Sequence, residues 1–519
     1  MRLPAVMVAA VFSLAGSAPS VITSCDISLD MEGDTLVRTF EFTGIQGSDR
    51  LLSRISWGFE PATQSVVLET AEMGMEGSFS RVPEWSVDTL TGGSLWRRSL
   101  VTAFPALREG MEVRYRVLVR DWSGNWTGGP WAMIHPDIKG LRPLSMRVTV
   151  PADLMASLHW EGSGYRSMRR GSAMEFTASD PAGTLVISPF GSPEEAGEFL
   201  LEEAVTRLTS PFPPDLREAA LQAASAGADE YAQSMRARTL LCNSMSPVNV
   251  MRGERTGSCR ELQSILDSRR VTPLEMAVVY AAVCTELGMT ASIEPAGGPD
   301  RSVTVPTEWE RFLVRLTGRD GDSWLVEPFA WLTPASWIHR PEPLNHISGG
   351  RLLRMPANGP DESLCRENWL LDAATGDFVL EMSVSGWFDM ELRRRIAGIP
   401  AGELLLQLAE WSWTSGRTVV PRSVESSDPF DLEDEMVLRV TGSAWNRGSS
   451  DIFAELLPVL SWERPDTVPG AVIVTWTLEG SAFAWASGDL SIRREAGRTI
   501  LSDTSAHTAP APVILEIEP

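Results

Sequence analysis

One stretch, 272–288 (TPLEMAVVYAAVCTELG), constrains the fold more than any other part of the chain. Thr272 can cap a helix, Pro273 suits the first helical position because its missing N–H would be unpaired there, and Glu275 can reach back to the cap. The centre of the stretch, AVVYAAVC, is apolar at every position, so the helix has no polar face. The glycine at its end can adopt the left-handed conformation that stops a helix. We therefore predict a helix over about 273–287 that is buried on all sides.

Sheet strands are expected to follow this helix. After a loop rich in Gly and Pro, the apolar runs 310–316 (ERFLVRL) and 323–328 (SWLVEP) flank the sequence GRDGD. An Asp-Gly pair between two apolar runs is a hairpin signal. The sequence thus predicts a buried helix followed by an antiparallel pair of strands.

At this point the chain resembles the transglutaminase-like superfamily. The family pattern is G-x-C at the start of a buried Ala-rich helix that ends in Leu-Gly-Ile-x-Ala, then a strand that opens with His, then a strand that carries W-x-x-D-P. Here the helix ends in ELGMTA, and WLVEP at 324–328 stands where the last motif belongs. By the family's spacing, the nucleophile position falls on Pro273, or on Thr272 with a slip of one residue. The His position falls in 310–312, around Arg311, and the Asp position on Glu327.

The resemblance implies a papain-like α+β domain in which other residues replace the family's catalytic Cys, His and Asp. A nucleophilic Cys in such a fold is activated by a helix N-terminus and a neighbouring imidazole. A proline keeps the helix start and provides no nucleophile, so we expect no catalytic residues. Any bound peptide is expected at the N-terminal end of the helix, in a groove formed by Thr272, Arg311, Trp324 and Glu327.

A rival nucleophile lies upstream. The sequence GSCRE (257–261) imitates G-x-C, which makes Cys259 the fallback candidate for a thiol enzyme. However, the following residues read as a short amphipathic segment, and 269–271 (RRV) separate it from the buried helix. The simpler interpretation is a surface helix with an incidental Cys.

The N-terminus reads as a signal segment over 1–24. Met1-Arg2 precede a stretch without charges, with a small-residue cleavage sequence at 16–18 (GSA). This predicts export to the periplasm or cell envelope. Alternatively, ITSC at 22–25 resembles a bacterial lipobox, which would make Cys25 a lipidated first residue and the only membrane attachment of the protein.

Composition limits the partners. The chain has 519 residues, 43% hydrophobic and 22% charged, with a formal net charge of −23. This charge argues against nucleic acid and against an anionic membrane surface. The five Cys lack CxxC pairs and the five His are scattered, so we predict no metal and no cofactor.

The fold class predicted is a multidomain α+β protein. Residues 25–192 show alternating strands and are expected to form a β-sandwich, which resembles a bacterial domain of unknown function that commonly precedes transglutaminase-like domains. Residues 193–345 begin with helical sequence and form the transglutaminase-like domain. Residues 350–519 are expected to be mostly β and sandwich-like, interrupted by one helix, ELLLQLAEW.

An aromatic loop lies in the first domain. Trp122, Trp126 and Trp131 stand on a Gly-rich connection and could stack against a sugar or a peptide. Aromatic residues in β domains more often cover the end of a sandwich.

Three classes of function remain. The first is a non-catalytic envelope protein that binds a protein or peptide partner through a retired transglutaminase-like scaffold. The second is a thiol peptidase or amidase that uses a Cys outside the expected position. The third is a glycan-binding protein that uses the Trp loop. The five His of the chain do not fall at the family's His position, which favours the first class.

Overall fold

The computed structural model of the protein describes most residues of the chain. They are 18–59, 64–75, 77–82, 85–89, 98–104, 107–122, 130–138, 140–208, 212–225, 229–248, 259–359, 362–372, 375–400, 402–412, 420–443, 452–456, 471–479, 483–486, 491–495, 498–505 and 513–517. The protein is a multidomain, strand-rich α+β protein. It divides into two compact units, one built mainly from residues 1–200 and the other mainly from 201–247, 258–297 and 310–519.

The first unit contains one large sheet and two small ones. The large sheet has the order β12-β13-β10-β1-β2-β8-β4-β5. Its strands are β1 (Val21–Glu32), β2 (Thr35–Ile45), β4 (Gln64–Met75), β5 (Ser78–Arg81), β8 (Glu112–Asp121), β10 (Ser145–Pro151), β12 (Arg166–Arg170) and β13 (Ala173–Ser179). The small sheets are β3 (Arg54–Phe59), β7 (Arg98–Ala103) and β6 (Trp85–Thr89), and β11 (His159–Glu161), β14 (Leu185–Ser188) and β9 (Ala132–Ile134). Two short helical segments, η1 (Leu51–Ser53) and α2 (Ala152–Met155), connect strands.

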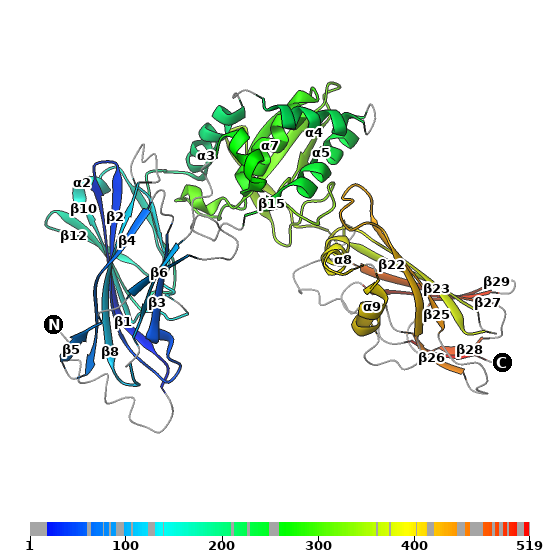
Figure 1. The fold of residues 1–519 in the computed structure, drawn as a ribbon, viewed down its shortest axis with the longest axis horizontal. Coiled ribbons are helices and arrows are strands. Elements are labelled where there is room, and N and C mark those ends of the chain that lie inside the picture. The colour runs from blue at the N-terminus through cyan, green and yellow to red at the C-terminus, as the bar shows by residue number, and fades with distance from the viewer. Residues whose placement is uncertain are drawn as a thin grey trace. The chain divides into compact units, whose positions relative to one another are not determined.

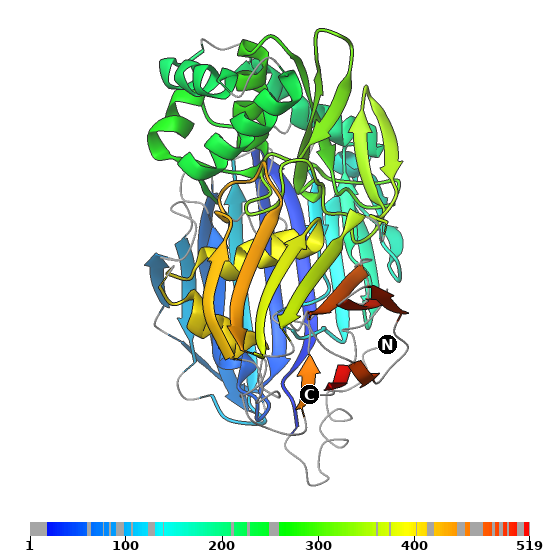
Figure 2. The same ribbon diagram turned by 90° about the vertical axis from the view of Figure 1, so that its right-hand side faces the viewer.

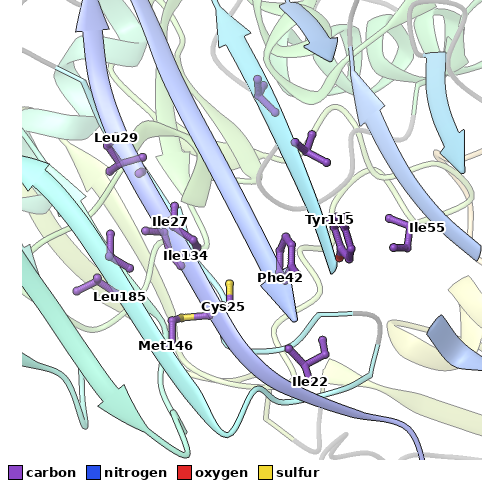
Figure 3. Packing of buried hydrophobic residues seen from close by; sticks show 14 of the residues in the cluster. Ile22, Cys25, Ile27, Leu29, Phe42, Ile55, Tyr115, Ile134, Met146 and Leu185 are labelled. Carbon is purple, nitrogen blue, oxygen red and sulfur yellow. The ribbon is translucent and has the colours of Figure 1, made fainter. Parts of the chain in front are cut away.

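All three sheets contribute to one core. Ile55 of β3, Ile134 of β9 and Leu185 of β14 belong to the same buried cluster as residues of the large sheet, among them Cys25 and Tyr115 (Figure 3). The period-two pattern explains this arrangement, because alternate residues of β8 and β10 are buried while their neighbours are more exposed. The alternation expected of strands within residues 25–192 is present in β8 and β10.

The second unit begins with helices packed on a central sheet. Five strands run in the order β19-β18-β17-β20-β21, and helices α4, α5 and α7 gather on one side of them in both views (Figures 1 and 2). The elements are α4 (Pro214–Ala224), α5 (Glu230–Ser244), β15 (Ser246–Pro247), α6 (Leu262–Ser268), β16 (Arg270–Val271), α7 (Pro273–Glu286), β17 (Thr290–Ala296), β18 (Arg311–Thr317), β19 (Ser323–Val326), β20 (Leu344–Ser348) and β21 (Arg351–Met355). Helix α3 (Pro193–Leu208) precedes them.

Helix α7 is the predicted buried helix. Every residue from Pro273 to Cys284 is buried, and Gly288 has φ +93° just after the helix end. The prediction of a helix buried on all sides is confirmed, and so is the hairpin formed by β18 and β19.

The rest of the second unit is a second strand-rich part. A seven-stranded sheet has the order β24-β25-β23-β22-β27-β30-β29, and a three-stranded sheet has the order β26-β31-β28. The strands are β22 (Leu364–Asp372), β23 (Asp377–Val384), β24 (Val420–Ser426), β25 (Met436–Ser443), β26 (Ile452–Leu456), β27 (Ala471–Glu479), β28 (Phe483–Ala486), β29 (Ser491–Glu495), β30 (Arg498–Ser505) and β31 (Val513–Ile517). Helices α8 (Trp387–Ala397) and α9 (Leu404–Ser412) interrupt them. Helix α9 matches the predicted ELLLQLAEW, whereas the sequence analysis did not predict α8.

One segment of the predicted middle domain belongs to the first unit. Residues 298–309, including η2 (Pro306–Glu308), cluster with it. Val303 and Val305 are buried with Val186 of β14, and Glu161 of β11 accepts hydrogen bonds from Ser302 Oγ at 2.9 Å and from the Val303 N–H at 3.1 Å. Local sequence does not reveal this exchange, because the partners lie more than a hundred residues apart.

Within the described residues, no helix combines the length and the apolar character that a membrane span requires.

Candidate functional site

The N-terminus of α7 is closed by a polar cluster. Thr272 Oγ1 accepts from the Glu275 N–H at 3.3 Å, and Glu275 Oε2 accepts from the Thr272 N–H at 2.9 Å, which is the predicted capping box. Arg260 donates from Nε to Glu275 Oε1 at 2.7 Å and from a terminal nitrogen to Oε2 at 3.0 Å. Pro273 occupies the first helical position and has no N–H. The position where the resemblance puts a nucleophile is therefore filled by groups that satisfy one another.

Arg311 and Glu327 form an ion pair. Arg311 Nε donates to Glu327 Oε1 at 2.6 Å and a terminal nitrogen to Oε2 at 2.5 Å, a bidentate geometry. The Glu327 side chain is 10% exposed and that of Arg311 25% exposed. These are the residues at the family's His and Asp positions, and in this chain they pair with each other.

The strand register places this pair on the sheet face away from the helices. Arg311 lies opposite Ala296 in the pairing of β17 and β18, and side chains alternate along a strand, so Arg311 shares a face with Leu313. Trp324 of β19 lies opposite Leu316 of β18. Because Leu316 and Arg311 point to opposite faces of the sheet, Trp324 points to the face away from Arg311.

Trp324 points to the helix side. Its Nε1 donates to Ser234 Oγ of α5 at 3.1 Å, and Tyr280 of α7 donates to the Ser234 carbonyl at 3.2 Å. Of the four residues expected to form one groove, the structure joins Arg311 to Glu327, leaves Thr272 in the cap cluster, and puts Trp324 on the opposite face. The expected groove is thus not assembled from these four side chains.

Buried Arg238 of α5 fixes the segment that follows β19. It is fully buried and donates to the carbonyls of Glu327 at 3.0 Å, Thr333 at 2.9 Å and Ala330 at 2.5 Å. One turn later, Cys242 Sγ lies 3.6 Å from the Pro328 carbonyl. The backbone beside Glu327 is therefore held by a guanidinium, since three carbonyls share its donors.

An imidazole stands near the ion pair. His339 lies within electrostatic range of Arg311, Glu327 and Arg394. Burial lowers the pKa of His339, and the charge of Arg311 lowers it further, although Glu327 acts in the opposite direction. Neutral imidazole is therefore the favoured form at pH 7.

The thiols of this chain are all buried. Burial raises the pKa of Cys25 and of Cys242, and it raises the pKa of Cys284 to about 12. Cys259, the fallback nucleophile, is 3% exposed and lies before α6 rather than at the start of a helix. The segment expected to be a surface helix is the short helix α6, in which Leu262 and Ile265 are buried, and the Cys259 side chain in front of it is part of the interior. A protonated, buried thiol is a poor nucleophile.

A second polar cluster on the same sheet was missed by sequence reasoning. His346 Nδ1 lies 2.8 Å from Glu294 Oε2 of β17. Glu294 Oε1 accepts hydrogen bonds from Arg315 Nε at 2.6 Å and from Ser348 Oγ at 2.6 Å. Burial acts to raise the pKa of Glu294, but these hydrogen bonds outweigh it and hold the pKa below its usual value. Ser348 bonds the carboxylate rather than the imidazole, so the set is not arranged as a nucleophile with its base.

A large pocket lies at the other end of α7. Its volume is about 930 Å³. Helices α4 and α5, the end of α7 and the β18–β19 hairpin line it, with Leu287, Gly318 and Trp324 among the lining residues. Sequence reasoning did not find it, because its walls come from four separate segments. Only Trp324 belongs to the residues predicted to bind a ligand.

Among the described residues, the Trp side chains of this loop do not come together as a binding platform. Trp131 packs against Phe190 and Phe199, with ring centroids 6.0 Å and 5.5 Å apart. Trp122 is 45% exposed. Trp126 lies outside the described residues.

The position of Cys25 in the structure argues against the lipid-anchor alternative. Its side chain is fully buried among Phe42, Tyr115 and Met146 (Figure 3), and Val21 and Ile22 continue the same strand in front of it. An acylated first residue needs a free strand end and an exposed sulfur, and this position provides neither. Residues 1–17 of the predicted signal segment lie outside the described residues.

The described residues contain no group of three or more His, Cys, Asp or Glu side chains that could hold a metal ion.

The comparisons with known proteins concern the fold. Neither the protein-family models nor the curated proteins gave a match. A candidate protease from Parabacteroides distasonis ATCC 8503 is similar over 97% of this chain and 94% of its own, with a TM-score of 0.60 and 11% identity. An M1 zinc metallopeptidase from Deinococcus radiodurans aligns with 34% of this chain and 44% of its own, at 19% identity and a TM-score of 0.21, which carries no argument. The first likeness extends to the fold alone.

Proposed function

We propose that the protein is an exported bacterial cell-envelope protein whose central part is a non-catalytic transglutaminase-like domain that binds a protein or peptide. One observation carries the proposal. The residues at the three family positions have structural partners: Pro273 starts a capped helix, and Arg311 and Glu327 pair with each other on the face away from that helix. A cation that cannot lose its proton has replaced the general base that a thiol enzyme requires.

The proposal includes a finer description of the domains. The first unit is a β-sandwich of the kind that accompanies transglutaminase-like domains, which is supported by the single core shared by its three sheets. The central helix on a five-stranded antiparallel sheet supports the transglutaminase-like assignment. The C-terminal strands form a sandwich-like domain around a core that includes Trp369, Phe378 and Leu438.

Binding and catalysis can be measured on the same sample. Full-length protein is immobilised and incubated with a mixed peptide library, and mass spectrometry records which peptides are retained and whether any is cleaved, deamidated or cross-linked. We expect retention of a subset with unchanged masses. New products that disappear in a Cys242→Ser or Cys259→Ser variant would overturn the proposal in favour of a thiol enzyme.

A matched control separates binding from nonspecific adsorption. Heat-denatured protein carries the same charge as the native protein but lacks the folded site, and the bare matrix measures adsorption to the support. Retention by the native protein only is expected, and equal retention by the denatured protein would contradict a folded binding site.

Export is tested by the mass of the mature chain. Ser20 is buried and donates from its N–H to Asp49 at 2.9 Å, and the Ala18 carbonyl accepts from the Ser48 N–H at 3.0 Å. We therefore expect cleavage before Ala18 or close to it and an unmodified thiol at Cys25. An acylated chain that begins at Cys25, or an uncleaved chain in the cytoplasm, would contradict this part of the proposal.

A further inference from the structure

The pocket at the C-terminal end of α7 has a definite chemical character. The charged residues that line it are Arg217, Asp229, Glu230, Glu286, Arg319, Asp320 and Asp322. Five carboxylates face two guanidinium groups, which gives the walls a formal excess of three negative charges. A volume of about 930 Å³ is within the range of pockets that bind ligands.

Both guanidinium groups are already paired. Arg217 Nε lies 3.2 Å from Glu286 Oε1. Arg319 Nε lies 3.3 Å from Glu230 Oε1, and the Arg319 N–H donates to Glu230 Oε2 at 2.8 Å. A Cβ at Gly318 would come within 2.4 Å of Glu230 Oε2, so any larger residue there would displace this carboxylate from its present position. The two guanidinium groups are therefore neutralised by Glu286 and Glu230 within the pocket wall. The other three carboxylates, Asp229, Asp320 and Asp322, give the pocket its net negative charge.

The remaining acidic groups stand at the rim. Asp320 and Asp322 are exposed in the turn between β18 and β19. Asp229 caps α5 by accepting from the Tyr231 N–H at 2.9 Å. The C-terminal end of α7 lines the same pocket through Glu286 and Leu287, and the negative end of its helix dipole favours a cation further.

An aromatic pair forms part of the wall. The rings of Tyr231 and Trp324 meet edge to face with centroids 5.6 Å apart. The hydrogen bond from Trp324 Nε1 to Ser234 fixes the indole, and Tyr231 is 40% exposed. Aromatic faces attract ammonium and guanidinium groups. Leu221, 69% exposed, offers an apolar contact beside them.

We infer that this pocket binds a basic peptide segment of a partner protein, with a Lys or Arg side chain held among the carboxylates and against the aromatic pair. This inference rests on the proposed binding function and names its site and ligand class. The occupant is a peptide because charge complementarity selects a cation, while the volume of the pocket and the exposed apolar Leu221 suit neighbouring residues of the same segment.

Fluorescence anisotropy with the full chain tests the inference. The probes are a fluorescein-labelled peptide that carries several lysines between Leu and Gly residues, and two counterparts in which Glu or Gln replaces every Lys. We expect only the lysine peptide to bind, with an affinity that falls as salt is added. The double variant Asp320→Asn/Asp322→Asn should weaken binding about tenfold and reduce the salt dependence, because it removes two rim charges.

Two controls define the site. Glu425→Gln/Glu435→Gln removes two exposed carboxylates from β24 and the residue before β25, and it should leave binding unchanged. Tyr231→Phe keeps the aromatic ring and should retain binding, whereas Tyr231→Ala should weaken it several-fold. These variants alter exposed side chains, and their circular dichroism spectra show whether each one has folded.

The possible outcomes are distinct. Equal binding of the Glu or Gln peptide, unchanged binding by the rim variant, or binding of free spermidine without the peptide would overturn the inference and leave the proposed function standing. Absence of binding by every peptide would overturn the inference as well. Thiol-dependent products from the peptide library would instead overturn the proposed function.

Discussion

Removal of Arg311 should destabilise the central sheet far more than removal of an exposed arginine. Arg311→Ala leaves the Glu327 carboxylate, which is 10% exposed, without its bidentate partner. Breaking a buried ion pair on one side costs about 3 to 5 kcal/mol. Because Arg311 is 25% exposed and water can replace part of the contact, we expect the lower end, about 3 kcal/mol.

Amide hydrogen exchange measures this loss where it occurs. A loss of about 3 kcal/mol corresponds to a roughly hundredfold faster exchange of the β18 and β19 amides that open with the sheet. The Arg311→Leu/Glu327→Leu variant removes both charges and should recover most of the protection. The exposed Arg120, 3.5 Å from Glu32, is the matched control, and Arg120→Ala should cost less than about 1 kcal/mol. Less than a tenfold change for Arg311→Ala would refute the reasoning.

Three further predictions concern titration and capping. His339 should titrate below pH 6.5 in NMR spectra, and the stability linked to it should be complete above pH 6.5 and fall as pH decreases; a titration at or above 6.5 would contradict its burial beside Arg311. Glu294 has a lowered pKa, so stability should be present above about pH 4.5 and fall as pH decreases further, and Glu294→Gln should flatten this acid limb in urea unfolding. Thr272→Ala should cost about 1 kcal/mol, and Glu275→Ala about 3 kcal/mol because Arg260 loses its partner; equal losses would argue against that ion pair.

Local sequence predicted the parts of the fold that depend on neighbouring residues. The capping box of Thr272 and Glu275 spans one helical turn, so its letters alone determine the contact. The alternation in β8 and β10 likewise follows from one strand at a time. Helix α8 was missed because Asp389 and Arg393 are fully buried within it, a pattern that resembles a polar surface segment until the ion pair between them is known.

The site depends on contacts that local sequence does not contain. The bond between Glu294 and His346 joins strands 52 residues apart, and the pocket is lined by residues from 217 to 324. The face to which Arg311 points could have been predicted, since Phe312, Val314 and Leu316 alternate with it and only one set can face α7. The spacing of the family motifs matched Arg311 to the family's His position, but it did not predict which face of the sheet the Arg311 side chain occupies.

The most direct test of the central claim is the reactivity of the five thiols in the native protein. The full chain is treated with iodoacetamide between pH 6 and 9, and mass spectrometry measures the rate at each Cys. We expect all five to react slowly at neutral pH and to react together only after denaturation, because every one is buried and Cys284 has a pKa of about 12. Rapid labelling of one native Cys at pH 6 to 7, at Cys259 or Cys242 above all, would reveal an activated nucleophile and contradict the non-catalytic assignment.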